Sequence, residues 1–222
     1  MPTKRADMRF GDEEECRVVK VLEICVLPDS RRIKLTVEMP DPDRFLTSQV
    51  PHLPRALFRL FPRLAQHKCE NGLGLSFRQE CRRTEIPHLF EHLIIELQSQ
   101  AQPAEVLRGE TEWNWTVDPR GRFHVYVDYE NELLAIGSIR LAEKVMDALD
   151  RRDLEAIQID AEMGRLCDLA RLGRELLGRS AESQWSEDAI EVSAMPLPKL
   201  EKESRTQRSW ASVSLTGESV AA

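Results

Sequence analysis

Two pairs of short segments with β-strand patterns constrain the fold of this chain more than any other feature. Residues 16–27 (CRVVKVLEICVL) and 32–39 (RIKLTVEM) carry β-branched side chains in partial alternation, and the turn-forming residues PDSR separate them. Residues 112–117 (EWNWTV) and 122–129 (RFHVYVDY) repeat this arrangement around the turn DPRG. Each pair predicts a β-hairpin.

Helical segments occupy the sequence between and after the two hairpins. The apolar residues of 55–66 (RALFRLFPRLAQ) fall on one helical face, although Pro62 is expected to kink or end that helix. Residues 130–150 and 153–177 have the spacing of two long amphipathic helices. Strand pairs that alternate with helices predict an α/β (α+β) two-layer domain, in which an antiparallel or mixed sheet packs against helices.

A further helix is predicted at residues 84–100, where the apolar spacing is helical. Thr84 is expected to be its N-cap, because a threonine hydroxyl can accept a hydrogen bond from a free backbone N–H of the first turn. Pro87 falls within that first turn, where its missing N–H costs nothing.

Length and composition define the predicted domain. A chain of 222 residues and 25.5 kDa suits a single medium-sized domain that can bury a core. Beyond about residue 180, Ser, Glu, Lys and Pro dominate and the helical periodicity fades. We therefore expect a flexible N-terminus at 1–14, one domain at 15–192, and a disordered, mobile C-terminal tail at 193–222.

The composition argues against several classes of protein. No apolar run approaches the ~20 residues of a membrane helix and the N-terminal residues have no secretory h-region, so we expect a cytoplasmic protein without membrane contact. A net charge of -7 and a pI near 5.4 argue against a nucleic-acid binder. The cysteines are odd in number and form no C-x-x-C pair, so we expect reduced thiols, with Cys69 and Cys81 as small core residues.

The sequence HLFEH is the strongest candidate for a chemical site. On a helix, His88, Glu91 and His92 share one face. Two imidazoles one turn apart can hold Zn²⁺, and the adjoining carboxylate can then take a proton from water, as in the inverted H-x-x-E-H zinc peptidases. On pattern alone, the alternative is a hydrogen-bonded, half-buried histidine pair.

The third ligand of such a zinc site is expected from the segment DYENELL at residues 128–134. A catalytic zinc needs three protein ligands and an open position for water, and Glu132 and Glu130 are the candidates for the third ligand. Both glutamates precede a helical run, where a carboxylate also interacts favourably with the helix dipole. Either one can therefore be a first-turn acid without contact to a metal.

The stretch FPRLAQHKCENGLGLSFRQECRRTEIPHLFEHLIIELQ, residues 61–98, resembles the N-terminal domain of cyanophycin synthetases. That family has a leucine-rich helix, a His-x-Cys and glycine loop, and a His-x-x-Glu-His helix that continues into Glu-Leu-Gln. The resemblance extends through RGET, HVYVDYENE and the two closing helices, over about residues 15 to 190. The matching residues are His67, Cys69, Gly72, Phe77, Thr84, His88, Glu91, His92, Glu96, Leu97 and Gln98.

The resemblance implies a site and a substrate. In some synthetases this domain is understood to carry a metallopeptidase-like site that cuts cyanophycin, a poly-aspartate backbone with arginine on each side chain, and thereby produces primers. By resemblance, His88, His92 and Glu132 are the expected zinc ligands and Glu91 the expected general base. The residues expected to orient ligands or to contact substrate are His67, Tyr129 and Glu130.

The chain departs from the family pattern at the flanks of the site. Where the family has a glycine-glycine-phenylalanine turn, this chain has LSF at 75–77, and where the family has Gly-Thr-Trp, it has RTE at 83–85. Pro87 replaces a glycine of the family, so different substrate contacts are expected. The sequence has no Gly-rich phosphate loop and stops where ATP-grasp and ligase-like domains would follow, so ATP-dependent ligation is not expected. Two hypotheses follow: a zinc-dependent peptidase-like hydrolase that cleaves cyanophycin or a related peptide, and a non-catalytic module that binds the polymer or partners a synthetase.

Overall fold

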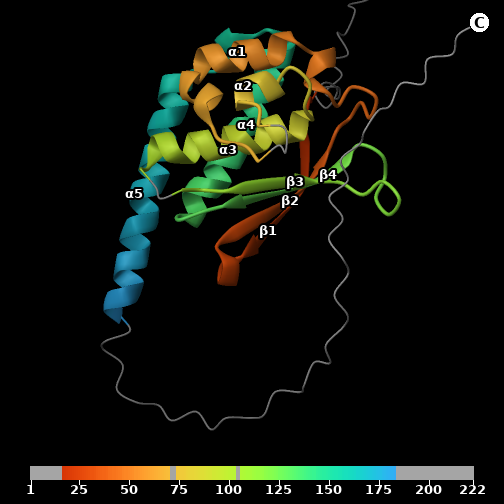
Figure 1. Ribbon diagram of the computed structural model, residues 1–222. Coiled ribbons are helices and arrows are strands. Elements are labelled where there is room, and N and C mark those ends of the chain that lie inside the picture. The colour runs from red at the N-terminus through yellow and green to blue at the C-terminus, as the bar shows by residue number, and fades with distance from the viewer. Residues whose placement is uncertain (1–16, 71–73, 104–105, 184–222) are drawn as a thin grey trace, which may run out of the picture. The chain divides into compact units, whose positions relative to one another are not determined.

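A four-stranded antiparallel sheet forms one layer of the fold (Figure 1). The computed structural model describes residues 17–70, 74–103 and 106–183, and no helix within these ranges is both long and apolar enough to cross a membrane. The strands are β1 (Lys20–Leu27), β2 (Arg32–Glu38), β3 (Gly109–Glu112) and β4 (Arg122–Asp128), in the order β1-β2-β4-β3.

The central strands β2 and β4 bury one face of the sheet. Their side chains alternate between buried and half-buried positions, as expected for strands whose successive residues point to opposite faces. The fully buried residues are Ile33, Leu35, Val37, Phe123, Val125 and Val127. The first predicted hairpin is confirmed, because β1 and β2 pair antiparallel from Lys20 with Glu38 to Leu27 with Arg32.

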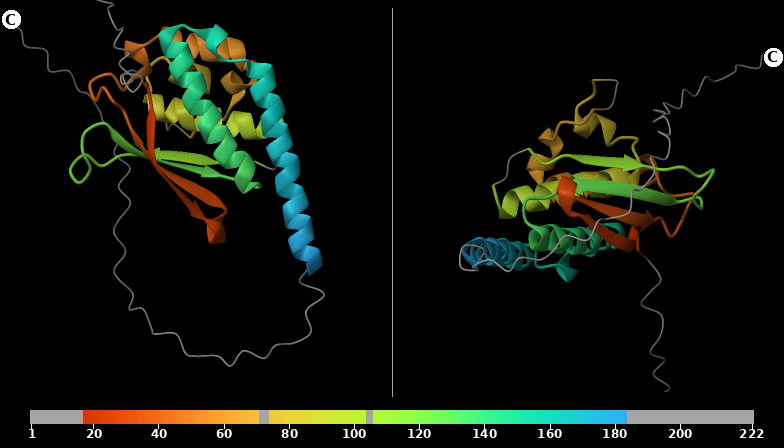
Figure 2. Two further views of the ribbon diagram at one scale, coloured as in Figure 1. Left: turned by 180° about the vertical axis from the view of Figure 1, so that it is seen from behind. Right: turned by 90° about the horizontal axis from the view of Figure 1, so that it is seen from below.

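Helices form the second layer, on the buried face of the sheet. α3 (Ile86–Ala101) contacts β3 and β4, and its residues from Leu89 to Gln98 are all buried. α4 (Glu132–Arg151) packs against α3, and α5 (Ile159–Ser183) packs against α4 (Figure 2). The predicted two-layer α+β fold is therefore confirmed, whereas the predicted domain boundaries at 14/15 and 192/193 lie outside the described residues.

The predicted helix at 55–66 is shorter than the sequence pattern indicates. α1 (His52–Leu60) ends before Pro62, and Pro62–Gln66 form a separate 3₁₀ turn. Proline has no N–H to donate and its ring obstructs the preceding turn, so the α-helix stops there. A one-turn helix that the sequence pattern does not predict, α2 (Phe77–Glu80), follows the glycine-containing loop.

The second predicted hairpin is confirmed in its second strand, which is β4, but it is wrong in its first strand, of which only Glu112 belongs to β3. β3 pairs with β4 but ends at Glu112, and the residues predicted as strand at 113–117 form a loop. The side chain of Asn114 accepts hydrogen bonds from the backbone N–H of Thr116, at 3.2 Å, and from its hydroxyl. Such a local turn competes with strand pairing and overrides the strand pattern.

The N-cap prediction at Thr84 is wrong. Glu85 is the N-cap residue of α3 and makes no side-chain capping bond, while Pro87 lies in the first turn as predicted. The backbone N–H of Thr84 instead donates to Thr47 Oγ1 at 2.9 Å, which ties the start of α3 to the segment before α1. The Thr84 hydroxyl is thus free to face His88.

Candidate metal site

The N-terminal half of α3 presents the motif residues to the interior. The ring centroids of His88 and His92 lie 4.9 Å apart, as expected for side chains one turn apart on one helical face. Phe77 of α2 stacks on the imidazole of His92 with a centroid distance of 3.8 Å, and it meets His88 edge-on. This aromatic lid leaves His92 only 5% exposed.

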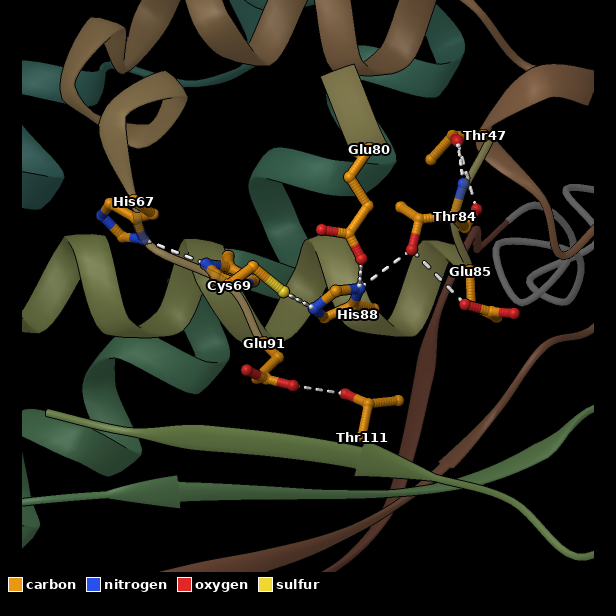
Figure 3. A network of polar contacts seen from close by, with 10 residues as sticks. Thr47, His67, Cys69, Glu80, Thr84, Glu85, His88, Glu91 and Thr111 are labelled. Atoms are coloured by element: carbon orange, nitrogen blue, oxygen red, sulfur yellow. Dashed lines mark hydrogen bonds and ion pairs between the residues drawn. The ribbon is translucent and has the colours of Figure 1, made fainter. Parts of the chain in front are cut away.

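Three side chains converge at this position. One ligand atom each from Cys69, His88 and His92 lies within 4.8 Å of the others, and this is the group of metal-ligating side chains found among the described residues. Cys69 Sγ is 3.4 Å from His88 Nε2 (Figure 3). Donors about 2.0 to 2.3 Å from a tetrahedral zinc ion are themselves separated by about 3.4 to 3.6 Å. The three donor types and the Cys69–His88 spacing therefore fit Zn²⁺, with a fourth position left for water or substrate.

Hydrogen bonds orient the ring of His88. Its Nδ1 lies 2.9 Å from the Thr84 hydroxyl and 3.7 Å from Glu80 Oε1 (Figure 3). With Nδ1–H donating to Thr84, the lone pair of Nε2 points toward Cys69, as a metal ligand requires. Burial lowers the pKa of His88, although the nearby Glu80 and Glu85 carboxylates oppose this effect. The ring is thus kept neutral and able to coordinate.

A second chain of hydrogen bonds orients His92. His67 Nδ1 lies 3.1 Å from His92 Nδ1, and His67 Nε2 lies 2.7 Å from a carboxylate oxygen of the buried Glu96. If His67 donates its Nε2–H to Glu96, its Nδ1 accepts from His92 Nδ1–H. That tautomer leaves His92 Nε2 unprotonated for coordination, and it is the carboxylate–histidine arrangement found behind metal ligands.

The charge states of Glu96 and His92 favour the same tautomers. Burial works to raise the pKa of Glu96, but hydrogen bonds from His67 and Gln100 outweigh it and lower that pKa, so Glu96 accepts as a carboxylate. Burial, together with the neighbouring His88 and His67, lowers the pKa of His92 to about 2. His92 is therefore neutral at any ordinary pH.

The carboxylate of Glu91 is directed toward β3, and it lies close enough to Cys69 for its charge to raise the pKa of that thiol. Its carboxylate accepts a hydrogen bond from the Thr111 hydroxyl at 2.6 Å, and only 3% of the residue is exposed (Figure 3). Burial raises the pKa of Glu91 to about 8, against the hydrogen bond from Thr111. β3 approaches so closely at Gly109 that a Cβ there would overlap the Glu91 carboxylate. Glu91 is thus free of the ligand set and held in one orientation.

The structure does not bring the predicted third ligand to the histidines. Glu132 is exposed at the start of α4, and Glu130 lines a small cavity beside Gln98 near the end of α3. Gln98 lies six residues beyond His92, or about 9 Å along the helix axis. The reason is the direction of β4. The backbone carbonyl of its last residue, Asp128, accepts a hydrogen bond from the Gln98 side chain, so α4 begins near the C-terminal end of α3 and away from the histidines.

Cys69, and not Glu132, is the third member of the cluster around the two histidines. The prediction that Cys69 is a small core residue therefore misses its place in the cluster. One signal in the sequence is its position two residues after His67, which indicates that both side chains can reach one site. Tyr129 is buried directly after β4, and its backbone N–H donates to Arg31 O at 2.9 Å. His67 does lie against His92, as the prediction that it orients a ligand requires.

A family model places the chain among known domains. The model of the cyanophycin synthase-like N-terminal domain matches residues 33–151, which is more than half of the chain. The chain belongs to this family. The match runs from β2 to the end of α4 and so includes α3 and the Cys69, His88 and His92 cluster. A comparison with curated proteins finds no match.

Proposed function

We propose that this cyanophycin synthase-like N-terminal domain is a zinc-dependent, peptidase-like hydrolase that cleaves cyanophycin or a related peptide. Cys69, His88 and His92 are the proposed metal ligands, and Glu91 is the proposed general base. The observation that carries the proposal is the convergence of three donor atoms within 4.8 Å, each histidine being held by its other nitrogen. Family membership supports the choice of polymer.

The residues around the ion divide the chemical work. Zn²⁺ bound there would polarise the scissile carbonyl and lower the pKa of a water molecule. Glu91 accepts the proton of the attacking water and passes it to the leaving amine, and the Thr111 hydroxyl holds its carboxylate in place. Thr84 and His67 keep the two imidazoles in the coordinating tautomer.

The Cys69 and His88 contact also resembles a cysteine nucleophile with its base. Burial, together with the hydrogen bond and the charge of Glu80, raises the pKa of the Cys69 thiol to about 12. A nucleophilic cysteine needs the opposite, a pKa lowered toward neutrality. A divalent cation would deprotonate the thiol by direct coordination, so Cys69 fits the role of a ligand better than that of a nucleophile.

A non-catalytic module is the second candidate function, and the burial of Glu91 favours it. A carboxylate that is 3% exposed, with a pKa near 8, is largely protonated at neutral pH and has little access to solvent. In that case the domain binds the polymer or a synthetase, and the cluster holds a structural ion. The two candidates differ in turnover, which an assay on the polymer measures directly.

The reduced cysteines bear on the compartment of either candidate. The four described cysteines, Cys25, Cys69, Cys81 and Cys167, are all free thiols. A thiol ligand to zinc persists best where disulfides do not form. We propose the cytoplasm as the compartment.

Metal analysis and hydrolysis of purified cyanophycin test the proposed function together. We expect about one equivalent of zinc per chain, and a release of shorter polymer that Glu91→Gln abolishes with the zinc retained. Glu132→Gln serves as the matched control, since it makes the same substitution at an exposed position, and it should leave both readouts unchanged. Absence of zinc, or full hydrolysis by the Glu91→Gln variant, would contradict the proposal.

A further inference from the structure

A groove between α1 and α2 carries four arginines and no acidic residue. It has a volume of about 990 Å³, within the range of ligand sites. Arg55 and Arg59 line it from α1, and Arg78 and Arg82 line it from α2 and the turn that follows. We call these four residues and the cavity between them the arginine groove. No metal ligand proposed above lines it.

The arginine groove has the charge of an anion site in a chain that is acidic as a whole. The net charge of the chain is -7, yet none of the four guanidinium groups forms an ion pair with a carboxylate of the described residues. All four arginines are exposed at the rim. The nearest acid in the sequence, Glu80, is directed to the opposite side of α2, where it lies 3.7 Å from His88.

Part of the arginine groove is preorganised. The guanidinium of Arg78 lies over the ring of Phe58, 6.0 Å from its centroid, and Phe58 also lines the groove. Phe58 in turn packs edge-on against Phe77 with a centroid distance of 6.3 Å. A guanidinium held on an aromatic face loses less conformational freedom when it binds a carboxylate. The wall of the groove thus packs against Phe77, the α2 residue that also covers His92.

The spacing of the arginines identifies the shape of the ligand. Arg55 and Arg59 are four residues apart on α1, which separates them by about 6 Å along the helix axis. Arg78 and Arg82 repeat this spacing in sequence on the facing wall, where the Arg82 N–H bonds to Gln79 O at 3.2 Å and continues the turn. Alternate side chains of an extended peptide repeat at about 6.6 to 6.8 Å. The Arg55 and Arg59 pair thus matches the repeat of alternate carboxylates, and Arg78 and Arg82 supply a second pair across the groove.

We propose that the arginine groove binds an acidic peptide segment in extended conformation, whose alternate Asp or Glu side chains pair with Arg55, Arg59, Arg78 and Arg82. Arginine forks bind carboxylates through two parallel hydrogen bonds, which makes the recognition directional. The groove acts independently of metal chemistry, so a chain without zinc or with Glu91→Gln binds the segment with unchanged affinity.

Fluorescence anisotropy with a labelled peptide tests this proposal. The probe is a peptide of about twelve residues that alternates aspartate and serine, titrated with the full chain at low and high salt. We expect saturable binding that weakens with salt and that falls at least tenfold in the double variant Arg59→Gln with Arg82→Gln. The matched control is Arg63→Gln with Arg83→Gln, which removes the same charge from exposed residues outside the groove and should change the affinity less than about twofold.

Four results would overturn the proposal. The first is that the peptide does not bind, and the second is that the two double variants lose affinity equally. The third is that a peptide with asparagine in place of aspartate binds as well as the aspartate peptide. Competition completes the test: ATP or single-stranded DNA that displaces the peptide at a lower concentration than unlabelled peptide identifies a phosphate site instead. Thermal unfolding of each variant shows that a loss of binding is not a loss of fold.

Discussion

Glu91→Gln is expected to stabilise the metal-free protein at neutral pH while it removes hydrolysis. The carboxylate is 3% exposed and accepts a hydrogen bond from Thr111, and burial raises its pKa from 4.5 to about 8. A glutamine at this position keeps an oxygen that can accept from Thr111 but never ionises. The variant therefore isolates the cost of a buried negative charge.

The raised pKa of Glu91 sets both the sign and the size of the effect. The folded chain binds this proton more tightly than the unfolded chain, so the contribution to stability is complete below about pH 4.5 and is lost as the pH rises through about 8. Each pKa unit corresponds to about 1.4 kcal/mol of folding free energy. The total loss in the free energy of unfolding is therefore about 5 kcal/mol, of which about 3.5 kcal/mol falls between pH 5 and pH 8. A loss of this size is large against a typical free energy of unfolding of about 5 to 15 kcal/mol.

Urea unfolding of both proteins with a chelator at pH 5 and pH 8 measures this difference. The free energy of unfolding of the variant should gain about 3.5 kcal/mol on that of the parent chain between the two pH values. Added zinc should shrink the gain, because a nearby cation lowers the cost of ionising Glu91. A difference between the two proteins that is the same at both pH values would refute the reasoning, since it would mean that Glu91 ionises in the fold as readily as in water.

Three further substitutions examine the surroundings of the cluster. Gly109→Ala should reduce hydrolysis at least tenfold with zinc retained, because the added methyl group displaces the Glu91 carboxylate; activity and zinc content of the purified variant measure this. His67→Ala should weaken zinc binding by about 10 to 100-fold in a chelator competition, because it removes the hydrogen-bond partner of His92. An unchanged zinc affinity would show that His67 does not orient His92 for coordination. Glu132→Gln should leave zinc affinity unchanged in the same competition, and a loss would restore that residue as a ligand.

Local patterns predict the layers of the fold well because they reflect local physics. The alternation in β2 and β4 and the helical spacing of α4 arise from which face each element buries, and both are visible in the sequence. The errors lie where a side chain competes with the backbone pattern. Asn114 closes a local turn and ends β3 early, and Thr84 faces a histidine instead of capping its own helix.

The candidate site shows the same division between local and tertiary information. His88, Glu91 and His92 lie on one helix, so their joint projection follows from spacing alone. The third ligand depends on which distant segment the fold delivers. Periodicity cannot show that β4 ends beside Gln98, or that the loop before α2 carries Cys69 to His88.

X-ray absorption at the zinc edge on the purified protein tests the central claim most directly. One sulfur at about 2.3 Å together with nitrogen and oxygen neighbours at about 2.0 to 2.1 Å would match a site made of Cys69, His88 and His92. The sulfur signal should disappear in Cys69→Ser. A first shell without sulfur in the parent chain, or a chain that binds no zinc at all, would contradict this account of the site.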